Sequence, residues 1–178
     1  MQLREYFGIG MTPEEYTGLL DEKQRRLHAH HERRVEIDPT AVDRLRSLGP
    51  FKVLVVTEPW CGDSLANLPV IVALCRRAGV ELRIVRRDEH IELIDRYLTN
   101  GGRSIPIAIV LDEDFEELFH WGPRPGPAQA IFEEHREEVA AGRVTKSKVH
   151  KEIRAFYARD KGKTIGEEFL AGFDVESA

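Results

Sequence analysis

One of the two cysteines stands where a strand is expected to give way to a helix. Cys61 lies in the segment Glu58-Pro59-Trp60-Cys61-Gly62-Asp63-Ser64, directly after the apolar run 51–57. At a helix N-terminus, the free backbone N–H groups and the partial positive charge favour the thiolate over the thiol. Because the thiolate is the nucleophile, we expect Cys61 to be the reactive group of this chain.

The composition is that of an ordinary globular protein. The chain has 178 residues, of which 42% are hydrophobic and 32% charged, and its net charge is −5. It is long enough for one domain with additions, and its charge gives no reason to expect nucleic acid as a partner. Two cysteines are too few for a disulfide-rich secreted scaffold. The N-terminal segment has no basic residues followed by an apolar core, as a signal peptide would, and no run reaches the ~18 apolar residues of a membrane span. We therefore expect a cytoplasmic protein with no membrane partner.

The segments around Cys61 predict an α/β arrangement. The apolar run 51–57 lacks polar alternation, which is typical of a strand buried on both faces. A helix that contains Pro69 follows Cys61. The remaining expected elements are, in chain order, a strand at 80–86, a helix at 89–98, a hairpin of 107–111 with 115–121, and a helix at 128–140. A parallel βαβ unit therefore meets an antiparallel hairpin in one mixed sheet.

Further helices are expected on both sides of this core. Thr12-Pro13 is typical of a helix start, and the apolar stripe that follows runs to Leu27. Asp38-Pro39 predicts a second, short helix by the same logic. In the tail we expect helices at 145–159 and 165–173.

Two clusters of titratable residues are interpreted as solvated surface. Residues 143–163 contain eight Lys or Arg against two acidic residues, and we interpret these charges as the wet side of a docked helix, not as a nucleic-acid site. His28, His30 and His31 have no accompanying ligand pattern with zinc spacing. We therefore expect no metal site there.

The chain resembles the thioredoxin family over residues 39–140. Residues 60–64 are similar to the Trp-Cys-Gly-Pro-Cys motif of that family, and Pro69 falls where its long helix carries a kinking proline. Arg103-Ser104-Ile105-Pro106 is similar to its segment before the cis-proline. The resemblance implies a thioredoxin fold, with a mixed central sheet flanked by helices. The extra helices, at 1–38 and 141–178, suggest an extended branch of thioredoxin-like proteins, with the C-terminal extension packed on the same domain.

The resemblance also implies roles for individual residues. Cys61 would be the nucleophile, and Pro106 would be cis beside it, although an ordinary trans proline at the start of a strand is the alternative. The backbone of Ile105 would pair with an extended substrate. The residues expected at the site are Cys61 and Ser64 for catalysis, and Trp60, Gly62, Asp63, Ile105 and Pro106 for substrate binding.

Two departures from the family pattern bear on mechanism. Ser64 replaces the second motif cysteine, and Val55 replaces the buried acid that lies six residues before the nucleophile. A serine can donate a hydrogen bond to the thiolate but cannot resolve a mixed disulfide. Cys75 cannot replace it on a continuous helix, because fourteen residues rise by ~21 Å whereas bridged Cα atoms lie within ~7 Å. We expect Cys75 to be a buried core residue.

Charged residues near Cys61 affect how easily it ionises. Asp63 suits a helix N-terminus, but its charge opposes thiolate formation, so we expect a smaller lowering of the thiol pKa than the motif alone would give. Arg103 either offsets this charge or is a surface cation. Glu58 and His120 are candidates for proton transfer, with exposed polar positions as the alternative.

These features favour a monothiol thiol–disulfide oxidoreductase that needs no cofactor. Its partner would be a protein disulfide or a low-molecular-weight thiol such as glutathione, and its resolving thiol would come from a partner protein's cysteine or from such a low-molecular-weight thiol. One alternative is a redox-inactive binding or adaptor protein, which fits the missing cysteine and acid. The other is a glutathione- or iron–sulfur-binding protein like the monothiol glutaredoxins, since residues 61–64 resemble their Cys-Gly-Phe-Ser. Trp60 and the lack of their upstream lysine count against that reading.

Overall fold

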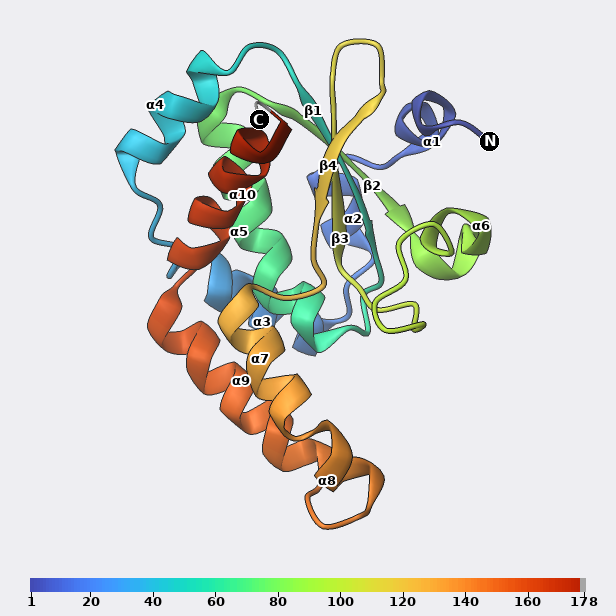
Figure 1. Ribbon diagram of the computed structural model, residues 1–178. Coiled ribbons are helices and arrows are strands. Elements are labelled where there is room, and N and C mark those ends of the chain that lie inside the picture. The colour runs from blue at the N-terminus through green and yellow to red at the C-terminus, as the bar shows by residue number, and fades with distance from the viewer. Residues whose placement is uncertain (177–178) are drawn as a thin grey trace.

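A four-stranded mixed sheet forms the centre of the molecule in the computed structural model, which describes residues 1–176 (Figure 1). Its strands are β1 (Lys52–Thr57), β2 (Glu81–Arg86), β3 (Ile107–Leu111) and β4 (Glu117–Trp121), in the order β2-β1-β3-β4. β1 pairs with β2 in parallel and with β3 in antiparallel fashion, and β3 and β4 form the antiparallel hairpin. The parallel unit and hairpin predicted from the sequence are therefore present in one sheet.

Helices flank both faces of this sheet. They are α1 (Leu3–Ile9), α2 (Pro13–Gly18), α3 (Glu22–Glu32), α4 (Pro39–Ser47), α5 (Gly62–Ala78), α6 (Ile91–Ile94), α7 (Gly126–Glu134), α8 (Arg136–Ala140), α9 (Lys146–Asp160) and α10 (Lys163–Glu176), with a 3₁₀ turn, η1, at Arg87–Glu89. Within residues 1–176, no helix is both long and apolar enough to cross a membrane.

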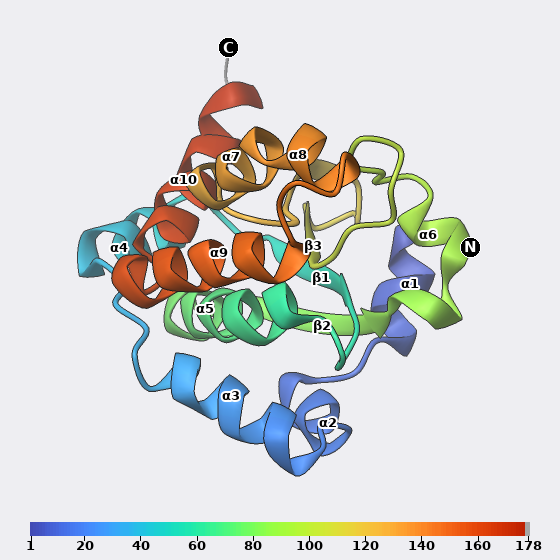
Figure 2. The same cartoon turned by 90° about the horizontal axis from the view of Figure 1, so that it is seen from below.

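The two faces of the sheet bury separate clusters of apolar side chains. On one face, alternate residues of β1 such as Val53 and Val55 pack with α2, α4, α5 and α10. On the other face, Leu54 and Val56 pack with α1 and α6, which lie together on one side of the sheet (Figure 2). Every residue of β1 from Val53 onward is buried, as expected for a strand covered on both faces. Cys61 belongs to the second cluster, at the edge where α5 begins.

The helix bounds near the N-terminus differ from those expected. α1 was not predicted, and the stripe expected from Thr12 to Leu27 is divided between α2 and α3 by a break before Glu22. Asp21 caps α3, its side chain accepting a hydrogen bond from the backbone of Gln24. A strong capping residue inside an apolar stripe therefore starts a new helix and leaves Leu27 37% exposed.

Two later helices are shorter than expected. The helix expected at 89–98 is reduced to η1 and the single turn of α6, and the helix expected at 128–140 breaks at His135 into α7 and α8. α9 and α10 are present close to the bounds expected for the tail. α9 packs against α7, and α10 packs against β4, α4 and α5 (Figures 1 and 2). The C-terminal helices thus reach both the sheet and the helix that begins at Cys61.

Candidate functional site

Cys61 is the N-cap residue of α5 and is nearly buried. Only 9% of its surface is exposed, and its Sγ lies 3.4 Å from the carbonyl oxygen of Ile105, to which the thiol donates a hydrogen bond. Burial raises the pKa of the Cys61 thiol; hydrogen bonds from Ser64 and from the backbone of Asp63 lower it, and the charge of Asp63 raises it further. The expected lowering of this pKa is therefore wrong, because the effect of burial outweighs that of these hydrogen bonds.

Ser64 connects the thiol to the protein interior. It is 1% exposed, and its hydroxyl oxygen accepts a hydrogen bond from the hydroxyl of Thr57, the last residue of β1. With that lone pair occupied, the Ser64 O–H is available to Cys61, and it lowers the thiol pKa. Ser64 therefore lies where it can donate a hydrogen bond to the Cys61 sulfur. Tyr16, which the sequence did not point to, places a buried hydroxyl within electrostatic reach of Thr57 and Cys61.

Asp63 is held by the C-terminal part of the chain. One carboxylate oxygen forms an ion pair with Arg124 at 2.7 Å, and the other accepts a hydrogen bond of 2.7 Å from the hydroxyl of Tyr157 on α9. That hydroxyl in turn accepts a hydrogen bond from Asn67 at 3.2 Å. Burial and the Asp63 charge raise the pKa of Tyr157, so it remains a donor. The cation that balances Asp63 is therefore Arg124, and α9 is fastened directly to the motif.

Ile105 and Pro106 lie beside the Cys61 thiol, which donates to the Ile105 carbonyl oxygen. The Ile105–Pro106 peptide bond is cis, and both residues are buried. Gly122, with φ of +127°, packs against this turn from the end of β4. A Cβ at Gly122 would lie 2.1 Å from the Pro106 carbonyl oxygen, so only glycine allows this close approach. The turn beside the thiol is thereby backed by the connector that also supplies Arg124.

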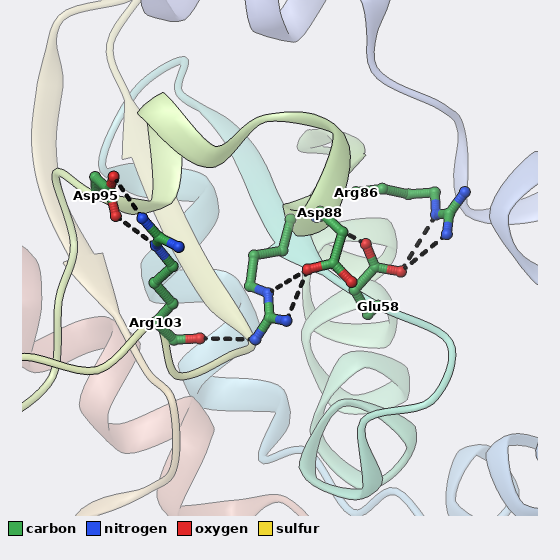
Figure 3. A network of polar contacts seen from close by, with 6 residues as sticks. Glu58, Arg86, Asp88, Asp95 and Arg103 are labelled. Atoms are coloured by element: carbon green, nitrogen blue, oxygen red, sulfur yellow. Dashed lines mark hydrogen bonds and ion pairs between the residues drawn. The ribbon is translucent and has the colours of Figure 1, made fainter.

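A polar network ties the loop before Cys61 to the loop before Pro106 (Figure 3). Glu58 is completely buried, accepts hydrogen bonds from Arg86 Nε and Nη2 at 3.2 Å each, and accepts one from the backbone N–H of Asp88 at 2.9 Å. Burial lowers the pKa of Arg86, but the neighbouring carboxylates outweigh this and raise it. Arg87 binds the Asp88 carboxylate and donates to the carbonyl oxygen of Arg103 at 3.1 Å. The two loops of the site are thus held in a fixed relation.

The same network settles the position of Arg103. Its guanidinium binds both carboxylate oxygens of Asp95, at 2.6 and 3.0 Å, on the surface. Of the two readings of the sequence, the surface cation is therefore the correct one. Trp60 is 55% exposed, and its ring stacks under the guanidinium of Arg87 at 4.7 Å from the centroid. Gly62 begins α5 with open space beside its Cα.

The two side chains considered for proton transfer are occupied elsewhere. Both carboxylate oxygens of Glu58 are bound by Arg86 and the Asp88 backbone. Nδ1 of His120 lies 2.8 Å from a carboxylate oxygen of Glu117. A buried acid does exist near the thiol, but it lies three residues before Cys61 instead of at Val55, and an arginine neutralises it.

The other cysteine and the histidine cluster lie apart from the thiol chemistry. Cys75 is 3% exposed on the unbroken helix α5, as predicted, and burial raises its pKa to about 12. His28 was expected on a solvated face but is buried, and burial lowers its pKa. Burial and neighbouring positive groups lower the pKa of His31 to about 4. Among residues 1–176 there is no group of three or more metal-ligating side chains arranged around an ion position.

An open groove of about 460 Å³ reaches Cys61 from the side of α9. It is lined by Leu27, His31, Trp60, Cys61, Gly62, Asp63, Ala66, Arg124, His150, Ile153, Arg154 and Tyr157. Four of the residues expected at the site line it, namely Trp60, Cys61, Gly62 and Asp63, whereas Ser64, Ile105 and Pro106 are not among its lining residues. Arg124, Arg154 and Tyr157 were missed from the sequence, because they follow the motif by some 60 to 95 positions and stand in no recognisable motif of their own.

The chain is similar to a known protein family and to solved structures. A family model described as thioredoxin matches residues 10–138. The crystal structure of a protein of unknown function from Pseudomonas aeruginosa is similar with a TM-score of 0.75 and 22% sequence identity over 99% of both chains. The crystal structure of an HIV epitope scaffold is similar with a TM-score of 0.73 and 21% identity, over 100% of this chain and 99% of its own. No curated protein matches the chain.

These likenesses agree with the mixed sheet and flanking helices predicted from the sequence, and at such identities the two crystal structures bear on the fold alone. The family model, by contrast, covers the greater part of the chain, including the strand, the Cys61 motif and the loop of Pro106. The chain therefore belongs to the thioredoxin family.

Proposed function

We propose that the protein is a monothiol thiol–disulfide oxidoreductase that acts through Cys61. The observation that carries this proposal is the position of Sγ, 3.4 Å from the Ile105 carbonyl oxygen and on the wall of an open groove. A thiol in such a position can be reached by a substrate sulfur while the rest of its surface is covered. Cys75 has no comparable access, being 3% exposed within α5.

The reaction needs one attacking sulfur from the protein. The Cys61 thiolate attacks one sulfur of a disulfide, forms a protein–substrate disulfide, and releases the other half as a thiolate that takes up a proton. A thiolate from a second, external thiol then attacks the mixed disulfide and releases Cys61. Ser64 supports the first step by donating a hydrogen bond to the thiolate, and no second cysteine of the chain is needed.

The pKa of Cys61 sets the speed of this chemistry. Because burial raises that pKa, only a small fraction of the thiol is ionised near neutral pH. Exchange should therefore be slow at neutral pH and become faster as pH rises towards the pKa. Once ionised, a thiol of high pKa is intrinsically the better nucleophile.

The raised pKa favours a second candidate, a binding or adaptor protein without redox turnover. In that case the exposed Trp60 and the groove would serve as a contact surface, and Cys61 would be a buried thiol that donates a hydrogen bond to Ile105.

Turnover separates the two candidates. The reduction of hydroxyethyl disulfide by glutathione would be followed at several pH values with the natural chain, with Cys61→Ser, and with Cys75→Ala as the matched control. An oxidoreductase accelerates the reaction, keeps the acceleration in Cys75→Ala, and loses it in Cys61→Ser. No acceleration by the natural chain at any pH would refute the oxidoreductase and favour the adaptor.

A further inference from the structure

The charges that line the groove beside Cys61 do not cancel. Arg124 is paired with Asp63, and His31, with its pKa lowered to about 4, is neutral near pH 7. Arg154 is exposed, and its side chain makes no hydrogen bond or ion pair with any other residue in the described part of the chain. The groove therefore carries an excess positive charge at Arg154.

The helix that supplies Arg154 extends this positive field. Residues 143–163 hold eight Lys or Arg against two acidic residues, and one of those acids, Glu152, is bound by His135 at 3.1 Å. Lys161 and Lys163 are paired with Glu36, at the far end of α9. Among the described residues, the basic side chains nearer the start of α9 have no ion-pair partner, so this part of the helix presents a positive potential to its surroundings.

The remaining lining of the groove suits a small molecule. Leu27, Ala66 and Ile153 contribute apolar surface, Trp60 contributes an aromatic ring, and the volume of about 460 Å³ is in the range of small-ligand sites. The positive charge of Arg154 and apolar walls thus lie beside one sulfur.

From this arrangement we infer that the groove between α5 and α9 selects small disulfides and mixed disulfides that bear carboxylate groups. The inference rests on the proposed function, since the substrate sulfur is the one that Cys61 attacks. Cys61 forms a bond to that sulfur, the substrate S–S bond breaks, and the departing thiolate keeps its carboxylate near Arg154 until it takes up a proton and leaves. Arg154 is a specificity-determining residue in this account, and it takes no part in the electron transfer.

A series of three disulfides of similar size and different charge tests the inference. Dithiodipropionate carries two negative charges, hydroxyethyl disulfide is neutral, and cystamine carries two positive charges. The rate at which each forms a mixed disulfide with Cys61 is measured by mass spectrometry in Cys75→Ala protein. Each rate is divided by the rate of the same disulfide with a free cysteine peptide, which removes differences between the leaving thiols.

We expect the normalised rates to fall in the order negative, neutral, positive. Arg154→Ala should slow the negative disulfide about threefold, as expected for loss of one exposed charge interaction, and molar salt should have the same effect on the natural chain. Arg154→Glu should reverse the order. Arg159→Ala, which removes an exposed arginine of the same helix outside the groove, should leave the order unchanged.

A binding measurement without disulfide exchange distinguishes the proposed oxidoreductase from the proposed selectivity of the groove. Dithiodipropionate should bind to Cys61→Ser protein, as measured by NMR titration, and Arg154→Ala should weaken that binding. If Cys61 exchanges with all three disulfides at equal normalised rates and Arg154→Ala changes nothing, the groove inference is overturned while the oxidoreductase stands. If Cys61 reacts with none of them but binding still depends on Arg154, the oxidoreductase fails and the anion-selective groove stands.

Discussion

The two cysteines of this protein lie on the same helix and differ in what opposes their burial. Cys75 is enclosed by the core, and burial alone raises its pKa to about 12. Cys61 caps the start of the helix, where hydrogen bonds from Ser64 and from the Asp63 backbone counteract the effect of burial without overcoming it. A helix N-terminus therefore makes a thiol reactive only if the thiol also keeps some access to solvent.

The largest expected effect concerns the charge of Asp63, which acts on Cys61 and not on Cys75. Asp63→Asn removes the negative charge beside the sulfur and leaves Arg124 without its counter-ion, so both changes favour the thiolate. We expect the pKa of Cys61 to fall and alkylation by iodoacetamide at neutral pH to quicken by about tenfold, equivalent to one pKa unit. The measurement is the alkylation rate of Cys61 against pH.

Asp95→Asn is the matched control for that change. It removes an exposed carboxylate whose arginine, Arg103, belongs to the loop of Pro106, and it should leave the alkylation profile in place. An Asp63→Asn profile that is unchanged, or moved to higher pH, would show that this carboxylate does not act on the thiol.

The pH dependence of the free energy of unfolding tests the raised pKa of Cys75. The folded protein keeps the Cys75 proton up to a pKa of about 12, whereas an unfolded thiol loses it above about 8.5. The unfolded state therefore binds fewer protons as pH rises, and the free energy of unfolding falls. Between pH values of about 7.5 and 9.5, Cys75 should account for a fall of about 1.4 kcal/mol.

Urea unfolding of the natural chain and of Cys75→Ala at the two pH values isolates this contribution, because all other groups are common to both. The natural chain should lose more stability than the variant over the interval. Equal losses would mean that Cys75 is less protected from ionisation than its burial implies.

The smallest expected effect concerns Ser64. Ser64→Ala removes a hydrogen bond that favours the Cys61 thiolate, so the thiol pKa should rise further. A net hydrogen-bond contribution of about 0.7 kcal/mol corresponds to alkylation about three times slower at neutral pH. Ser47→Ala, at the exposed end of α4, is the control and should have no effect. Faster alkylation of Ser64→Ala would contradict the tuning role.

Local sequence signals predicted the fold and the position of the thiol. The apolar run before Cys61, the proline within the helix that follows, and the turn of Pro106 each depend on neighbouring residues, and together they predicted the order of strands and helices. Element ends were less predictable, because a capping residue such as Asp21 competes with the apolar stripe that runs through it.

The electrostatics of the site could not be predicted in the same way. No local pattern indicated that Arg124 and Tyr157 contact Asp63, because these contacts form only after the connector and α9 fold back on α5. The predicted direction of the shift in the Cys61 pKa was wrong for a related reason. Helix position is visible in sequence, whereas the burial contributed by segments far along the chain is not.

The most direct test of the account is the pH profile of iodoacetamide alkylation at Cys61 in the folded Cys75→Ala protein, read by mass spectrometry. We predict that Cys61 is modified without unfolding, through the groove, and that its apparent pKa lies above the value of about 8.5 for a free thiol. An apparent pKa well below that value would contradict the conclusion that burial dominates at this site. Modification of Cys61 only on unfolding would contradict its access from the groove and, with it, the proposed exchange chemistry.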